Sequence, residues 1–254
     1  MRRMGQSVIL GVIPARLNST RLPGKVLRSI CGHAMLHHVF ARASRCELLE
    51  DLVVATDSKE VHEYCARNGM KVIMTSSSHI SGTDRVHEVT GMMPADIYVN
   101  IQGDEPMIRA EHLRVLLQPF MEDVSVQVTT LKTPIGFEEA QSPNCVKVVT
   151  DTHGKALYFS RFAIPYNRDP ATGATHHSKH LGIYAYTRSA LERFHELPPS
   201  RLEQAEKLEQ LRFLEHAIPI HVAETPHDTI GVDTEDDLAR VERYFQHLDP
   251  SDRI

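Results

Sequence analysis

The sequence of 254 residues has only four cysteines, no CxxC pair, no excess of basic charge and no apolar run long enough to span a membrane. Widely spaced cysteines of this kind predict reduced thiols in a cytosolic protein. A net charge of −5 gives no support for a surface that binds nucleic acid or an anionic membrane. The apolar stretch within residues 1–13 is too short for a signal peptide. We therefore expect a cytoplasmic protein without nucleic-acid or membrane partners, folded as a single domain over residues 1–254.

Strand-like apolar segments alternate with segments whose apolar residues recur at helical spacing. This alternation predicts an α/β fold with a doubly wound, mostly parallel sheet. The pattern loosens after residue 151, which predicts a few extra strands between 146 and 186 and a polar loop over 166–179. The expected strands are 8–13, 52–56, 71–74, 97–101, 126–130, 146–149, 181–186 and 220–223; the expected helices are 35–43, 58–68, 83–90, 109–120 and 203–215.

A loop rich in basic residues follows the first apolar strand. Parallel strands present their carboxyl ends at one edge of a sheet, where open α/β sheets bind ligands, so the loop predicts a polyanion such as a nucleotide triphosphate. It has neither the Walker A sequence nor the glycine spacing of a dinucleotide site, so neither an ATPase nor a dehydrogenase follows from it. A solvated basic loop is the alternative. The residues of this loop that could contact a polyanion are Arg16, Ser19, Thr20, Arg21, Gly24 and Lys25.

Acidic residues follow a second apolar strand, in the segment IYVNIQGDEPMI over 97–108. Gly103 allows a sharp turn, and Pro106 ends the strand. If both strands belong to one parallel sheet, Asp104 and Glu105 face the basic loop. Magnesium is usually held by one or two carboxylates together with substrate phosphates, so the pairing predicts a metal-nucleotide site. A simple turn would explain the acidic residues but not their pairing with the basic loop.

Eight segments taken in order resemble one known family, the 3-deoxy-manno-octulosonate cytidylyltransferases. The resemblance extends over residues 8–245, nearly the whole chain, and several motifs in series are more specific than any single one. The segments are PARLNSTRLPGK (14–25), VATDSKEV (54–61), SGTDR (81–85), VNIQGDEPMI (99–108), ALYFSR (156–161), HLGIYAY (180–186), EKLEQLR (206–212) and GVDTEDDL (231–238).

The resemblance implies a fold of the nucleotide-diphospho-sugar transferase type and a defined reaction. CMP would pass from CTP to the anomeric hydroxyl of 3-deoxy-D-manno-octulosonate (Kdo), which gives CMP-Kdo and pyrophosphate for lipopolysaccharide biosynthesis. It further implies Mg²⁺ as cofactor and a cytoplasmic homodimer. Positioning and charge stabilisation suffice for such a transfer, and the sequence identifies no general base.

The resemblance also implies the site residues. The catalytic set is Arg16, Lys25, Asp104 and Asp233, of which Asp104 and Asp233 would hold the metal. The nucleotide-binding set is Pro14, Ala15, Arg16, Arg21, Lys25, Ser81, Gly82, Thr83, Arg85 and Asp104. The sugar-binding set is Gln102, Arg161, His180, Tyr184, Glu209 and Gln210.

Several of these residues have an ordinary structural alternative. Residues 81–85 would also suit a helix N-cap. Thr234 and Asp237 nearly form a capping box, which accounts for both of them and leaves Asp233 free for the metal. Tyr184 could be a core tyrosine. Glu209 and Gln210 are expected within a helix over 203–215, whose polar residues would normally face water. The two histidines at 176–177 are expected to be exposed to solvent.

Two other functions stay open. The nearer is a cytidylyltransferase for a related sugar acid, such as 8-amino-Kdo or a sialic acid. The remoter is a catalytically silent nucleotide-binding regulator, which would have no chemical need for Lys25, Asp104 and Asp233 together. The chain departs from the family pattern in its short, histidine-rich 166–179 loop and at Thr187, where a basic residue is expected.

Overall fold

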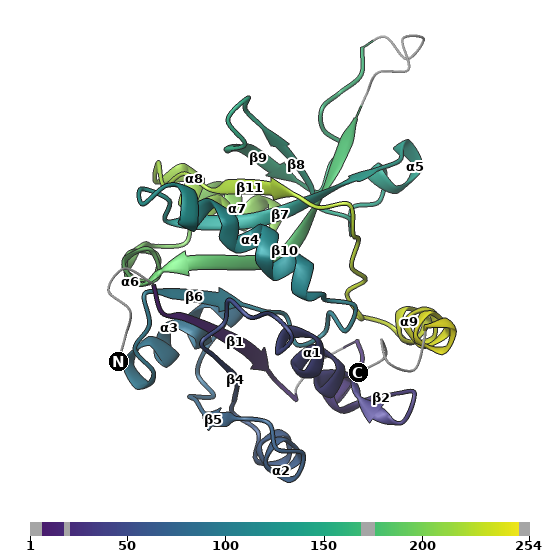
Figure 1. Ribbon diagram of the computed structural model, residues 1–254. Helices are drawn as coiled ribbons and strands as arrows, with labels where there is room; N and C mark the ends of the chain where they lie inside the picture. Colours follow the sequence, from purple (N-terminus) through teal and green to yellow (C-terminus); the bar gives the residue numbers. More distant parts are fainter. Residues whose placement is uncertain (1–6, 18–20, 169–175, 249–254) are drawn as a thin grey trace. The chain divides into compact units, whose positions relative to one another are not determined.

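The computed structural model describes residues 7–17, 21–168 and 176–248, which form two compact units (Figure 1). The first unit consists of Met1–Arg114 and Thr229–Ile254, and the second consists of Val115–Asp228. The C-terminal segment therefore returns to the unit that contains the N-terminal half. A single domain over residues 1–254 stays a prediction.

The first unit contains a parallel sheet in the order β6-β1-β4-β5. Nearly every residue of β1 is buried, as expected for a parallel strand covered on both faces. The predicted parallel sheet is confirmed, and the predicted strand positions hold to within two residues at each end. The strands are β1 (Ile9–Ala15), β4 (Asp51–Thr56), β5 (Val72–Met74) and β6 (Ile97–Asn100), with a separate small hairpin of β2 (Ser29–Ile30) and β3 (His33–Ala34).

Local sequence signals set the helix ends of this unit. Ser58 accepts a hydrogen bond from the amide of Val61 at the start of one helix, and Ser81 forms a capping box with Asp84 at the start of another. Three helices, α1, α2 and α3, pack against the parallel strands. The helices are α1 (Met35–Ala43), α2 (Lys59–Arg67), α3 (Gly82–Met92) and α9 (Glu235–His247), and α4 (Ala110–Glu122) begins here.

Strands of the second unit run in both directions. β10 pairs antiparallel with β7 and with β8, β8 pairs antiparallel with β9, and β11 pairs parallel with β7. The predicted extra strands are therefore confirmed. This unit contains β7 (Val128–Ile135), α5 (Phe137–Ala140), β8 (Lys147–Thr150), β9 (Ala156–Ser160), β10 (His177–Thr187), α6 (Arg188–Glu196), α7 (Arg201–Glu206), α8 (Leu211–Glu215) and β11 (His221–Glu224).

Two sequence expectations for this unit are wrong. The helix expected over 203–215 is interrupted, because Lys207 adopts a left-handed conformation with φ of 54° and ends α7. The polar loop expected over 166–179 ends earlier, because β10 already begins at His177. Residues 169–175 of that loop lie outside the described residues.

The composition predicts reduced cysteines and no membrane-spanning segment. All four cysteines are free thiols. Within the described ranges, none of the helices is long and apolar enough to cross a membrane.

Candidate active site

The end of β1 leads directly into the basic loop. Pro14 and Ala15 are its last residues, and the Arg16 guanidinium donates hydrogen bonds to the backbone carbonyls of His79 and Ser81. The loop closes at Gly24, whose φ of +65° is a left-handed conformation that glycine adopts without strain. A 3₁₀ helix, η1 (Lys25–Leu27), follows at once. Ser19 and Thr20 lie outside the described residues.

The loop after β6 lies against the end of β1. A Cβ atom at Gly103 would lie 2.9 Å from the carbonyl oxygen of Pro14, too close for any side chain. Only glycine therefore allows the two backbones to approach this closely. Asp104 is the next residue, so this close contact also fixes the backbone position of Asp104 relative to the end of β1.

Lys25 joins the two carboxylates that the sequence places far apart. Its ammonium group donates hydrogen bonds to Asp104 Oδ2 and, over 3.0 Å, to Asp233 Oδ1. Burial lowers the pKa of Lys25, but the charges and hydrogen bonds of Asp104 and Asp233 outweigh it, so the pKa of Lys25 lies above its usual value. Lys25 therefore remains protonated at neutral pH, and three charged groups converge at one point.

The backbone holds Asp233 in place. The amide of Val232 donates a 2.9 Å hydrogen bond to the carbonyl of Asp104, which fastens the two acid-bearing segments together. Thr234 and Asp237 form the complete capping box of α9, and Asp233 contributes no side-chain atom to it. The Asp233 carboxylate instead accepts a 2.8 Å hydrogen bond from Arg21. The capping box therefore does not use the Asp233 carboxylate, which pairs with Arg21 and Lys25, and its role in metal binding stays a prediction.

The residues expected to contact the base form the first turn of α3. Ser81 is its N-cap, so the capping interpretation is correct for this residue. Gly82 lies beside Pro14, while Thr83 and Arg85 are buried. The Arg85 guanidinium bonds Thr75 and lies 3.2 Å from Asp57, and burial lowers its pKa.

Sequence reasoning missed Asn100 at the end of β6. Its side chain is 2% exposed, and its amide oxygen has no hydrogen-bond partner among the described residues. The amide nitrogen lies 3.8 Å from the position that a Cβ of Gly82 would take. A buried polar group of this kind is usually satisfied by a partner, which a ligand can supply. The available signal was a polar residue closing an otherwise apolar strand.

In the second unit, Arg161 is held by the backbone. Its guanidinium donates to the carbonyls of Pro143 (3.0 Å), Glu206 (2.7 Å) and Lys207 (3.4 Å). These contacts tie the end of β9 to the end of α7. Since a guanidinium has five N–H donors, the contacts leave capacity for a carboxylate.

His180 and Tyr184 are buried on β10. Burial lowers the pKa of His180 to about 3, so its imidazole is neutral, and its Nε2 lies 3.0 Å from Thr130 Oγ1. The two rings are 5.4 Å apart, and Tyr184 also stacks on Tyr186 at 5.6 Å. Burial raises the pKa of Tyr184 well above its usual value. Both residues therefore also serve the core of this unit.

The remaining predicted sugar-binding residues lie in connecting segments. Glu209 and Gln210 fall between α7 and α8, and Gln210 is 8% exposed, so the expectation that they lie within a helix is wrong. Gln102 belongs to the first unit, in the loop after β6.

Two further sequence observations receive a structural explanation. His177 is buried and its Nδ1 lies 3.0 Å from the Ile164 carbonyl, so the expected solvated pair is wrong for this residue, while His176 is exposed. Thr187, where a basic residue was expected, is the N-cap of α6.

The donor set at Asp104 and Asp233 suits Mg²⁺. Two carboxylates that already share one cation offer hard oxygen ligands, and magnesium usually takes one or two carboxylates plus substrate phosphates. The described part of the chain contains no group of three His, Cys, Asp or Glu side chains arranged to hold a metal. With only two carboxylates available here, the phosphates of a substrate would have to supply further ligands to the ion. Magnesium binding stays a prediction.

The fold and the charged groups at its strand ends define a nucleotidyltransferase. The family described as cytidylyltransferase matches residues 10–220. The 3-deoxy-manno-octulosonate cytidylyltransferase of Koribacter versatilis is 57% identical over 93% of this chain and 90% of its own. The enzyme of the same name from Acidobacterium capsulatum is 56% identical over 92% and 95%.

A solved structure agrees with these relatives. The CMP:2-keto-3-deoxy-manno-octonic acid synthetase complexed with CTP has a TM-score of 0.91 and 45% identity, and the match covers 95% of this chain and 100% of that one. This chain belongs to the 3-deoxy-manno-octulosonate cytidylyltransferase family.

Proposed function

We propose that this protein transfers CMP from CTP to the anomeric hydroxyl of Kdo and releases pyrophosphate. The observation that carries the proposal is the convergence of Lys25, Asp104 and Asp233 where β1 and β6 end. Family membership supports the choice of substrates, since the relatives are named for Kdo and the similar solved structure is described as a complex with CTP.

In this reaction the sugar hydroxyl oxygen bonds to the α-phosphorus, and the bond to the pyrophosphate oxygen breaks. Lys25, Arg16 and Arg21 supply positive charge in the loop beside that position, where negative charge develops on the leaving group. Arg16 is fixed by the carbonyls of His79 and Ser81, so its charge needs no rearrangement during transfer.

Asp104 and Asp233 would hold Mg²⁺, and the ion would supply positive charge that offsets the negative charge of the CTP phosphates. The sugar hydroxyl must lose a proton, which Asp104 or solvent could accept. The chain's own groups otherwise act by positioning the reactants, which is the main requirement of nucleotidyl transfer.

The cytosine lies, in this proposal, beside the first turn of α3. Ser81, Gly82, Thr83 and Arg85 are joined there by Asn100, whose unsatisfied amide oxygen can accept from an exocyclic amino group. A base with a carbonyl at that position would leave the oxygen without a partner. This gives a physical reason for cytosine over uracil.

The sugar acid has one carboxylate and several hydroxyls. Arg161 suits the carboxylate, while Gln102, His180, Tyr184, Glu209 and Gln210 suit the hydroxyls. We further propose that the enzyme works as a homodimer in the cytoplasm and that its product enters lipopolysaccharide biosynthesis.

Pyrophosphate release from CTP, UTP, ATP and GTP, each with and without Kdo, tests this function. We expect release only with CTP and Kdo together, and loss of that release in the Asp104→Asn variant. Comparable turnover with ATP or GTP would contradict the base assignment. Faster turnover with 8-amino-Kdo or a sialic acid would change the sugar, and no turnover with any pair would favour a silent nucleotide-binding regulator.

A further inference from the structure

Lys147 is a buried lysine of the second unit whose ammonium group is bound to backbone. It lies at the start of β8, and its exposed fraction is 0%. Its Nζ donates hydrogen bonds to the carbonyls of Ser142 (2.8 Å), Cys145 (2.5 Å) and Arg161 (2.7 Å). An ammonium group has three N–H donors, so these carbonyls use its whole capacity. Any effect of Lys147 on the reaction therefore passes through the groups that it holds.

A buried ammonium group bound to neutral carbonyls is a costly way to stabilise a fold. Burial lowers the pKa of Lys147 from its usual value, because the surroundings disfavour the charged form. Apolar side chains of similar volume often replace buried charges with no loss of stability. The presence of a lysine here is therefore better explained by the backbone that it holds than by stability alone.

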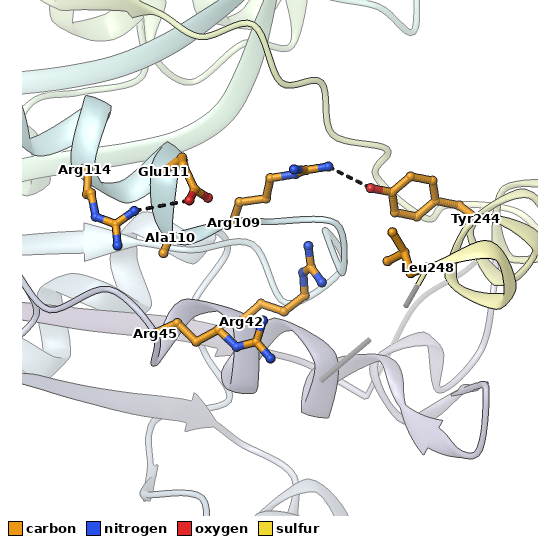
Figure 2. A pocket seen from close by; sticks show the side chains of 8 residues that line it. All are labelled: Arg42, Arg45, Arg109, Ala110, Glu111, Arg114, Tyr244 and Leu248. Carbon is orange, nitrogen blue, oxygen red and sulfur yellow. Dashed lines mark hydrogen bonds and ion pairs between the residues drawn. The ribbon is translucent and has the colours of Figure 1, made fainter. Parts of the chain in front are cut away.

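A pocket of the first unit shows the more usual arrangement for basic side chains (Figure 2). Arg114 pairs there with the carboxylate of Glu111 at 3.3 Å, and Arg109 donates a 2.8 Å hydrogen bond to the hydroxyl of Tyr244. Flexible side chains on both sides of such a contact fix little of the backbone. Lys147 differs because all the acceptors that the described residues give it belong to the main chain.

Two of the carbonyls belong to a segment that also holds the guanidinium of Arg161. Ser142 and Cys145 lie on either side of Pro143, whose carbonyl accepts a 3.0 Å hydrogen bond from Arg161 Nη1. Lys147 thus fixes the segment that holds one side of this guanidinium. Its third hydrogen bond fixes the carbonyl of Arg161 itself. Both the side chain and the backbone of Arg161 therefore depend on one ammonium group.

Glu206, the last residue of α7, holds Arg161 from the other side. Its Oε2 accepts a 2.9 Å hydrogen bond from the Arg161 amide, and its Oε1 accepts a 2.6 Å hydrogen bond from the hydroxyl of Ser160. Its own carbonyl accepts from Arg161 Nε over 2.7 Å. The backbone of Arg161 is thus bound at its amide by Glu206 and at its carbonyl by Lys147.

We propose that Lys147 and Glu206 are positioning residues for the sugar acid, which fix the Arg161 guanidinium so that its remaining N–H groups meet the substrate carboxylate. This inference rests on the proposed function, in which Arg161 binds the carboxylate of Kdo. A guanidinium binds a carboxylate best when two N–H groups lie parallel to its two oxygens, so a small displacement weakens the contact. Lys147 and Glu206 therefore set the affinity for the sugar acid without touching it.

Steady-state kinetics of Lys147→Met, with Kdo and CTP varied separately, tests this inference. Methionine keeps the length of the side chain but removes its donors. The KM for Kdo should rise about fivefold to twentyfold, and the KM for CTP should change by less than about twofold, since only the sugar acid meets the displaced group. Lys155→Met is the matched control, because it removes an exposed lysine just before β9 and should leave both KM values unchanged.

Val148→Ala separates loss of position from loss of stability. Val148 is the next residue of β8 and is 2% exposed, so the substitution removes buried apolar volume but none of the hydrogen bonds around Arg161. It should lower the melting temperature and leave the KM for Kdo unchanged. An equal rise in the KM for Kdo in Val148→Ala and Lys147→Met would overturn the inference.

A double-mutant cycle shows whether Lys147 acts through Arg161. In the Arg161→Ala protein, Lys147→Met should raise the KM for Kdo by less than about twofold, because the guanidinium that it positions is no longer present. The full effect of Lys147→Met in that background would overturn the inference.

Glu206→Ala covers the case in which Lys147→Met fails to fold. It removes the carboxylate that holds the Arg161 amide and keeps the backbone carbonyl that holds Nε, so it should also raise the KM for Kdo selectively. Equal changes in the two KM values in these variants, or no change in either, would overturn the inference while the proposed function stands. Absence of turnover with CTP and Kdo in the unsubstituted protein would overturn both.

Discussion

The two units hold their candidate residues in opposite ways. In the first unit, the charged side chains of Lys25, Asp104 and Asp233 neutralise one another. In the second, Arg161 is bound to backbone carbonyls and His180 is enclosed in the core. A side chain balanced by another side chain can exchange that partner for a substrate group. One bound to backbone is already fixed, so it adds to stability as well as to recognition.

Loss of either carboxylate tests the first half of this comparison and should have the largest effect. Asp104→Asn and Asp233→Asn keep the shape of the side chain but remove a charge, so each should lower turnover roughly a hundredfold or more. The double variant should lose much less than the product of the two, because in the proposed site both carboxylates would act through the same ion. Steady-state CMP-Kdo formation across a magnesium titration measures these effects.

Glu235→Gln is the matched control for this experiment. Glu235 is an exposed carboxylate two residues from Asp233 that pairs with Arg28, so its loss should leave turnover near normal. Circular dichroism confirms that each variant is folded. Near-normal turnover and unchanged magnesium dependence in folded Asp233→Asn would remove Asp233 from the metal site.

Arg161→Ala tests the second half of the comparison. One charge-assisted contact to a carboxylate contributes about 1.5 to 3 kcal/mol, so the KM for Kdo should rise roughly tenfold to a hundredfold, with little change for CTP. The melting temperature should also fall, because three carbonyls lose their donor. Arg168→Ala, an exposed arginine of the same segment, is the control. Equal losses for Kdo and CTP would move Arg161 out of the sugar site.

The buried state of His180 predicts a dependence of stability on pH. The folded protein keeps His180 neutral down to a pKa of about 3, whereas an unfolded chain protonates near 6.5. The unfolded state therefore binds more protons between these values, and stability falls as the pH decreases through them. The loss from this residue between pH 6 and pH 5 is about 1.4 kcal/mol at most.

Urea unfolding at both pH values, for the unsubstituted protein and for His180→Gln, measures this contribution. The variant should show a shallower decrease in unfolding free energy, whatever its absolute stability. His176→Gln removes an exposed histidine and should keep the full decrease. The same slope in all three proteins would show that His180 is protonated in the folded state as well.

Thr234→Ala should have the smallest effect and sharpens the role of Asp233. The substitution removes the N-cap of α9, which costs about 1 kcal/mol of stability. Turnover should not change, because the capping atoms are separate from the Asp233 carboxylate that contacts Lys25. Thermal unfolding and steady-state rates measured on one preparation separate the two effects. A large loss of turnover would show that helix capping positions Asp233.

Much of the first unit was predictable from the sequence because its signals are local and consistent. Apolar runs mark β1 and β6, and parallel strands place their carboxyl ends together, so the approach of Lys25 to Asp104 follows. Asp233 was assigned by family resemblance, because the Val232–Asp104 backbone hydrogen bond that positions it joins segments far apart in the chain.

The second unit was harder to predict for physical reasons. Lys207 ends α7 in a left-handed conformation that its residue type does not favour, so nothing in the local pattern indicates the break. His177 is buried by tertiary contacts although its neighbours are polar. Asn100 in the first unit was missed for a related reason. Only the tertiary structure shows that its buried amide oxygen has no hydrogen-bond partner among the described residues.

The close approach of Gly103 to Pro14 has a consequence for how this enzyme can be altered. A side chain at position 103 would push the backbone that carries Asp104 away from the end of β1. In a library with every residue at every position, position 103 should therefore be as intolerant as the charged positions, although glycine offers a substrate no functional group. An engineer who wishes to change the nucleotide or the sugar can vary the side chains around the site. The spacing between its two loops, however, depends on the absence of a Cβ atom at Gly103.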